Sequence, residues 1–160
     1  MKNAYALTDV KSVNKKLKGF KPNGMNREKV VSLLEEMRQL KIETHPFSFC
    51  FLFRSMFEIS AKAFCKDHKK EGLSSVKQNG YDKDLSDILR DIVKFITVNG
   101  TIKEKEKILH GALTELNKKD GILSVTSLNH LVHNPGFSIQ STDLCKLFHN
   151  IFPLLEEMNN

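Results

Sequence analysis

Cysteine is scarce in this sequence, and its three cysteines follow no metal-binding or disulfide pattern. Cys50, Cys65 and Cys145 are an odd number without a CxxC pair, which argues against a disulfide framework. A structural zinc site is equally disfavoured, because zinc needs four clustered ligands. We therefore expect reduced, buried thiols of the kind found in cytoplasmic proteins.

Long apolar runs are also missing. The longest covers residues 47–53, includes Ser48 and is followed by Arg54, whereas a membrane span needs about 18 apolar residues. The first residues contain no apolar stretch of signal-peptide length. Eight glycines and four prolines are too few for a fibrous or low-complexity chain. These absences predict a cytoplasmic protein without a membrane segment.

The sequence lacks the common catalytic and cofactor motifs. It contains no GxSxG, HExxH or HxxxH, and no phosphate-binding glycine loop. These absences argue against a serine hydrolase, a zinc protease, an ATPase and a kinase. We expect neither a cofactor nor a bound metal.

Positive charge is concentrated at the start of the chain. Of a formal net charge of +6, residues 1–21 supply +5, from six lysines and one aspartate. Such a segment attracts phosphate groups, so Lys15, Lys16 and Lys18 are candidate contacts to RNA or DNA. The alternative is a solvated tail. We divide the chain into a basic N-terminal segment or linker, 1–24, and a helical domain, 25–160.

Apolar residues recur at intervals of three and four, which predicts helices rather than strands. The length of 160 residues suits one core. We expect an all-α fold, a single helical bundle of six or seven helices. The expected helices cover about residues 8–18, 26–40, 46–69, 85–98, 103–116, 124–133 and 141–158.

Several residues are expected to begin, end or distort these helices. Thr8, Ser141 and Thr142 are candidate N-caps, since a side-chain oxygen there can accept from a free backbone N–H. Asn99 and Gly100 should end the fourth helix. Pro153 should kink or shorten the last one.

The helix expected at 46–69 is apolar almost all round in its first half, which predicts a central position. Arg54 and Glu58 lie four residues apart within it. An unpaired charge there would cost several kcal/mol, so we expect a structural ion pair between them. In the alternative, Arg54 points toward His133 and serves a binding site.

The short helix expected at 124–133 carries Asn129, His130 and His133 on one face, opposite its apolar side. The simplest interpretation is a solvated helix face that ends at an Asn-Pro-Gly turn. The alternative is RNA cleavage without a metal, which needs a proton acceptor, a proton donor and a cation near the phosphorus. A histidine that titrates near neutrality can fill either proton role.

The helical order, the helix with "LFRSMFEISAKAF" and the late "LNHLVH" resemble the HEPN superfamily of prokaryotic defence and toxin proteins, over Arg27 to Met158. HEPN ribonucleases carry an arginine, a polar residue, three others and a histidine. In that alignment Asn129 takes the polar position, His133 the histidine position and Leu128 the arginine position. The resemblance implies a degenerate motif, and it also implies a homodimer with facing motif helices.

The stretch "LKIETHPFSFCFLFRSMFEISAKAF" also resembles the helical region that follows a ParB-like nuclease domain in some bacterial proteins. That resemblance implies fusion to such a domain, with the lysine-rich start as the former linker. Together these features suggest an HEPN-like module of a bacterial defence or toxin-type system, noncatalytic alone, that associates with nucleic acid or protein. The alternatives are a metal-independent ribonuclease using His133 with Arg54, and a purely structural adaptor.

Overall fold

The computed structural model describes residues 9–119, 135–136 and 138–160. Within these residues it is all-helical, which confirms the all-α bundle, and its only β-type pairing is an isolated bridge between Val76 and Asp82. The helices are α1 (Val10–Gly19), α2 (Glu28–Gln39), α3 (Pro46–Asp67), the 3₁₀ turn η1 (Lys69–Glu71), α4 (Leu85–Ile96), α5 (Lys103–Ile108), α6 (His110–Leu116) and α8 (Ser141–Met158). None of the described helices combines the length and the apolar content that crossing a bilayer would require.

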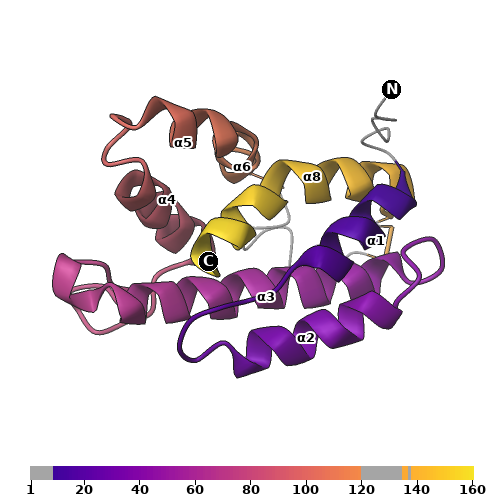
Figure 1. Cartoon of the computed structure of the whole chain (residues 1–160), viewed down its shortest axis with the longest axis horizontal. Coiled ribbons are helices and arrows are strands. Elements are labelled where there is room, and N and C mark those ends of the chain that lie inside the picture. Colours follow the sequence, from indigo (N-terminus) through magenta and orange to yellow (C-terminus); the bar gives the residue numbers. More distant parts are fainter. Residues whose placement is uncertain (1–8, 120–134, 137) are drawn as a thin grey trace.

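Helix α3 is the central element, as its composition predicts. It runs the length of the molecule, with α2 along one side and α8 and α1 on the other (Figure 1), and it contacts α2, α8 and α4. Pro46 occupies its first turn, where a missing N–H costs nothing. Phe49, Phe53 and Phe57 on this helix are fully buried.

Aromatic rings join α3 to the C-terminal helix. The rings of Phe53 and Phe148 stack with their centroids 5.0 Å apart, and Phe148 stacks on Phe152 at 4.6 Å. Phe20, just after α1, meets Phe152 edge to face at 5.2 Å. Such ring pairs add to the free energy gained from burial alone. The row therefore connects the first, central and last helices in one core.

Helix α1 belongs to this core, although it lies within the part of the sequence assigned to a basic N-terminal segment. Val13 and Leu17 are buried against the bundle. The N-cap is Asp9 and not Thr8: its carboxylate accepts from the Lys11 N–H at 2.9 Å. The negative charge of Asp9 also interacts favourably with the positive end of the helix dipole, which a neutral threonine cannot do.

The C-terminal end of α1 is held by an arginine from α2. The Arg38 guanidinium donates to the carbonyls of Leu17, Lys18 and Phe20 at 3.0, 3.3 and 2.8 Å. These are among the carbonyls that a helix end leaves without intrahelical partners. Both ends of α1 are therefore fixed by side chains.

The helix expected at 103–116 is in fact two. It breaks at Leu109, which is completely buried and adopts φ −92° and ψ 2°. The first part, α5, has no buried residue, so no core contact holds it in line with α6. In contrast, α6 packs closely on α8 at Gly111, where an added Cβ would lie 2.8 Å from the Asn150 carbonyl oxygen.

The bounds expected for α8 are confirmed. Pro153 does not shorten the helix, because Phe152, Leu154 and Leu155 are buried around the proline and keep this part of the chain against the core, and a kink there stays a prediction. The N-cap is Gln140 without a side-chain bond, so neither Ser141 nor Thr142 caps the helix. Helix α4 begins where expected but ends at Ile96, two residues early, and Val98, Asn99 and Gly100 all have positive φ and reverse the chain.

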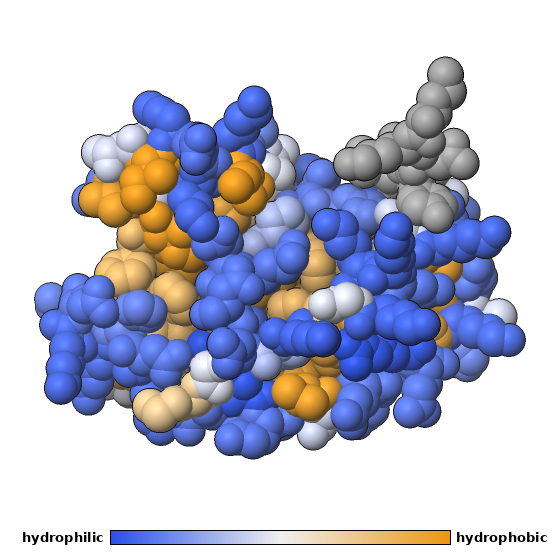
Figure 2. All heavy atoms as spheres, viewed as in Figure 1, coloured by the Kyte–Doolittle hydropathy of each residue, from blue (hydrophilic) through white to orange (hydrophobic). Residues whose placement is uncertain are grey.

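Hydrophobic side chains reach the surface in one main area of the face shown in Figure 2. They gather over the α4–α5 end of the molecule, while most of this face is hydrophilic. Val98, Ile102 and Ile108, from this end, are 53%, 42% and 50% exposed. The lysine-bearing helix α1 lies away from this apolar area.

Candidate functional site

The whole histidine face predicted from the sequence lies outside the described residues. This applies to Asn129, His130 and His133, and to Leu128 in the motif position of the arginine. Their proximity to Arg54 stays a prediction.

Arg54 is a buried member of the central helix. Only 7% of the residue is exposed. Burial lowers the pKa of its guanidinium, and the negative charge of Glu58 acts in the opposite direction. Glu58 itself accepts a hydrogen bond from Lys62 at 3.0 Å, an exposed ion pair that sequence reasoning did not anticipate. A direct Arg54–Glu58 ion pair therefore stays a prediction.

Two of the three predicted lysines share a pocket. Lys15 and Lys16 of α1 line a cavity of about 450 Å³ between α1 and α8, together with Ser12, Phe20 and Glu156. Lys18 does not line it, although its carbonyl accepts from Arg38. The structure therefore brings together part of the predicted lysine set.

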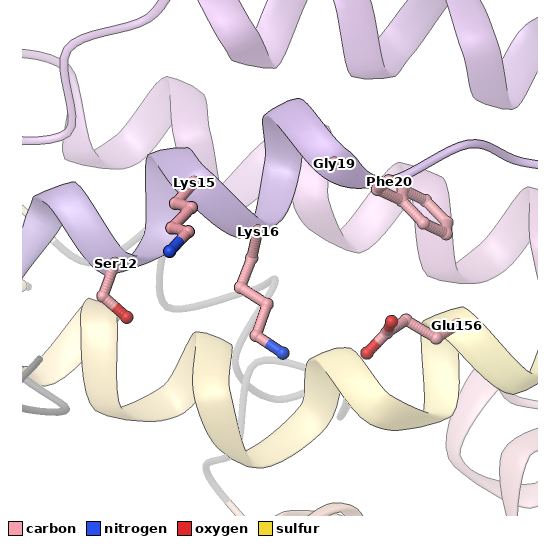
Figure 3. A pocket seen from close by; sticks show the side chains of 6 residues that line it. All are labelled: Ser12, Lys15, Lys16, Gly19, Phe20 and Glu156. Carbon is pink, nitrogen blue, oxygen red and sulfur yellow. The ribbon is translucent and has the colours of Figure 1, made fainter. Parts of the chain in front are cut away.

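Figure 3 shows how these side chains lie. Ser12 and Lys16 extend from α1 toward α8, and the Glu156 carboxylate turns toward the Lys16 ammonium. No ion pair joins Lys16 to any described residue. Because Lys16 keeps its charge available, the pocket can accept an anion, while Glu156 reduces the positive potential on one side.

A histidine absent from the sequence-based site lies at the same junction. His149 Nε2 of α8 is 2.9 Å from Ser12 Oγ of α1. Burial lowers the pKa of His149, and the positive charge of Lys16 lowers it further. The imidazole is therefore held in its neutral form at neutral pH, and the bond fastens the Ser12 turn of α1 to α8.

The sequence contained no local signal for this pair. Ser12 and His149 are 137 residues apart, and His149 stands next to Phe148 in an apolar helix without a motif around it. A serine nucleophile activated by histidine needs a third group that orients the ring. Among the described residues, no carboxylate bonds to the other nitrogen of His149. The Ser12–His149 bond therefore holds α1 in place on α8 and does not form a catalytic triad.

Within the described part of the chain, no group of three or more His, Cys, Asp or Glu residues could hold a metal ion. All three cysteines are free and buried.

No family model matches the chain, and neither do the curated proteins or the solved structures compared with it. A functional proposal therefore depends on the residues, on their geometry and on the resemblances given by the sequence.

Proposed function

We propose that this chain is a helical module that binds nucleic acid through the lysine pocket between α1 and α8, and that it is noncatalytic on its own. The proposal keeps the HEPN-like, bacterial defence-type interpretation suggested by the sequence resemblance. The observation that carries it is the position of Lys15 and Lys16 on one side of a helix that is anchored in the core.

Anchoring matters because it lowers the entropic cost of binding. A lysine on a mobile tail loses backbone freedom when it meets a phosphate, whereas a lysine on a fixed helix loses only side-chain freedom. Helix α1 is fixed by Asp9 at its start and by Arg38 at its end. Ser12, held by His149, adds a hydroxyl beside the ammonium groups. Phosphate contact by such groups supplies affinity without base specificity.

The test is fluorescence anisotropy with labelled single-stranded RNA and DNA at several salt concentrations. We expect a double Lys15→Gln and Lys16→Gln variant to bind more weakly and to reduce the salt slope by about 0.7 per lost phosphate contact. The matched control replaces two exposed lysines from other helices, Lys29→Gln and Lys107→Gln, with the same change in net charge. Equal losses in both variants would contradict the proposal.

Glu156 offers a test with the opposite sign. Because its carboxylate lines the same pocket, Glu156→Gln removes a repulsive charge near the bound phosphate. We expect tighter binding and a steeper salt dependence. Unchanged affinity would place the nucleic acid elsewhere on the surface.

The enzymatic alternative is a metal-independent ribonuclease using His133 with Arg54. Its basis is the sequence resemblance, with His133 in a proton-transfer role and Arg54 as the cation near the phosphorus. Structured RNA incubated with the protein and a chelator should then be cleaved, and His133→Ala should abolish the cleavage. Intact RNA with a mobility shift supports binding instead. If the RNA is neither cleaved nor shifted, the structural adaptor is supported.

The resemblances also lead us to propose a homodimer and a fusion to a ParB-like nuclease domain. Light scattering on the purified chain tests the first of these. A monomer at all concentrations would contradict a stable dimer.

A further inference from the structure

A second cavity lies at the other end of α3. It has a volume of about 550 Å³ and is enclosed by the last turns of α3 and by the loop that follows η1. Three lysines of α3 and η1 line one side, Lys62, Lys66 and Lys69. Gly72 and Ser75 come from the loop on the other side.

Two neighbouring elements, α3 and η1, bring these lysines together. Lys62 and Lys66 are four residues apart and share one face of α3, and Lys69, the first residue of η1, lines the same cavity. Lys62 is paired with Glu58, whereas Lys66 and Lys69 have no ion-pair partner among the described residues. No carboxylate lines this cavity, in contrast to the pocket that contains Glu156. The charged side chains that line the cavity are therefore all positive.

The opposite wall is a fixed turn. Gly72 adopts φ 97°, which favours glycine, and turns the chain back toward α3. The Ser74 hydroxyl accepts from the Val76 N–H at 3.1 Å and donates to the Val76 carbonyl at 3.0 Å, so it is used within the turn. The Lys83 N–H donates to the Ser75 carbonyl at 2.9 Å. This bonding holds the Ser75 residue at the cavity wall.

Ser75 also offers a donor to a ligand. Its hydroxyl makes no hydrogen bond to another described residue. Cys65 also lines the cavity and is only 3% exposed, and burial raises the pKa of this thiol to about 11. The thiol is therefore neutral at physiological pH and adds no negative charge to the cavity. Two ammonium groups and one hydroxyl line the cavity, and Asp91, whose charge reaches Cys65, lies outside the lining and is paired with Lys83 at 2.9 Å.

We propose that this cavity binds a phosphate group, with Lys66 and Lys69 as the cations and Ser75 as the hydroxyl donor. A tetrahedral oxyanion suits several donors that approach from both walls, and charged hydrogen bonds of this kind are about twice as strong as neutral ones. The site shares no residue with the pocket between α1 and α8, so it goes beyond nucleic-acid binding there. The phosphate can belong to a small phosphorylated molecule or to the end of an oligonucleotide.

The test uses the full chain labelled with ¹⁵N and titrated with inorganic phosphate at constant ionic strength. We expect saturable shifts of the backbone amides at residues 72–76. The double variant Lys66→Gln and Lys69→Gln should weaken binding by about tenfold or more. The matched control, Lys70→Gln and Lys77→Gln, removes two nearby exposed lysines that do not line the cavity and should bind as the parent does.

A second arm separates the two sources of phosphate. An oligonucleotide with a 5′-phosphate is compared with the same oligonucleotide without it, and a nucleoside monophosphate is titrated alone. Preference for the 5′-phosphorylated strand over the monophosphate indicates a nucleic-acid end, and the reverse indicates a small ligand. Either outcome supports a phosphate site, provided that Ser75→Ala also weakens binding of the phosphorylated ligand.

The proposal is overturned if the amides at 72–76 do not shift, or if the control variant loses binding as much as the Lys66 and Lys69 variant. Thermal melts of both variants should match the parent, because all four side chains are exposed. The variant with Lys15→Gln and Lys16→Gln should keep phosphate binding here. Failure at one site is therefore distinguishable from failure at the other.

Discussion

Arg27 joins the ends of three helices through a single buried guanidinium. It donates to Asn159 Oδ1 at 3.0 Å, to Asp67 Oδ2 at 2.9 Å and to the backbone carbonyls of Met25 and Met158 at 2.6 and 2.8 Å. Asn159 is itself fully buried and donates to Ser60 Oγ at 2.9 Å. One side chain thus joins the start of α2, the end of α3 and the end of α8.

Replacing Arg27 with methionine should therefore be severe. The change leaves buried oxygens of Asn159 and Met158 without their donor, and losing one partner of a buried charge network costs about 3–5 kcal/mol. The measurement is the free energy of unfolding from urea denaturation. Lys62→Met is the control, because it breaks an exposed ion pair with Glu58 and should cost less than about 1 kcal/mol. Similar losses in the two variants would show that the Arg27 network adds little.

His149 should make stability depend on pH. Its pKa is lowered in the folded state, by burial and then by Lys16, so the unfolded chain binds a proton more readily than the folded one. The contribution of His149 is therefore fully present above its unfolded pKa of about 6.5 and is lost as the pH falls below that value toward the folded pKa. Unfolding measured between about pH 5 and pH 8 should show this loss.

The variant His149→Gln isolates the effect, since five other histidines are present. It should lose part of the decline in stability below about pH 6.5, because glutamine does not titrate. Ser12→Ala is the companion variant: it removes the bond to Nε2 but keeps the titrating ring and Lys16. It should retain a decline. Identical pH profiles for His149→Gln and the parent would mean that another group is responsible.

Sequence reasoning missed the hydrogen bonds between side chains that lie far apart in the chain. Arg27 and Asn159 are 132 residues apart, and Ser12 and His149 are 137 apart. Neither pair belongs to a periodic pattern or a motif, so only the packing of helices brings them together. Lys15 and Lys16 were predicted as binding residues because charge clustering is visible in the sequence itself. The site at Ser75 depends on the turn at Gly72, which brings the loop back toward α3, and residue spacing in the sequence does not predict that turn.

At the scale of elements, helices with a strong apolar face were predicted well. Helices α2, α3 and α4 lie within a few residues of their expected bounds, because burial of one face decides where each helix forms. The error at Leu109 has a different origin. Charged residues of α5 fit a helix but none is buried, so the sequence could not show that the helix breaks before α6.

The close approach of α6 and α8 gives a prediction at this scale. Alanine at position 111 would improve helix propensity by about 1 kcal/mol, but its Cβ would lie 2.8 Å from the backbone oxygen of Asn150. Backbone atoms of two packed helices cannot both yield, so we expect Gly111→Ala to destabilise the protein by about 1–3 kcal/mol. Thermal denaturation measures the change.

Gly19 provides the matched control for this substitution. It is also helical, at the end of α1, and an added Cβ there would meet nothing within 4 Å. Gly19→Ala should leave stability unchanged or raise it slightly through helix propensity. If both substitutions stabilise the protein, α6 and α8 are not in the close contact described.

At the scale of the molecule, the core extends farther along the chain than the charge pattern suggested. Lysines of α1 indicated a basic segment apart from the domain, yet Val13, Leu17 and Phe20 belong to the same buried cluster as α3 and α8. Helix α1 is amphipathic: it carries lysines and also buries Val13 and Leu17 in the core. Sequence charge alone could not show this, because lysines occupy the solvent side of many helices that are buried on the other side.

The single core predicts how the three thiols react. Cys50 lies near the start of α3 and Cys65 near its end, and Cys145 lies on α8. All three are buried, and burial raises the pKa of Cys50 to about 12 and of Cys65 to about 11. Modification needs an accessible thiolate. Each thiol should therefore react only when the core opens.

Three variants that each retain one cysteine, with alanine at the other two positions, measure this opening by the rate of reaction with an aromatic disulfide reagent. If the bundle unfolds as one unit, the free energy of opening obtained at Cys50, Cys65 and Cys145 should agree with the global value from urea denaturation of the same variant. Cys65 is the sensitive position, because it lines the cavity beside the loop. A markedly lower value there alone would show that this end of the bundle opens separately, and would contradict a single cooperative core.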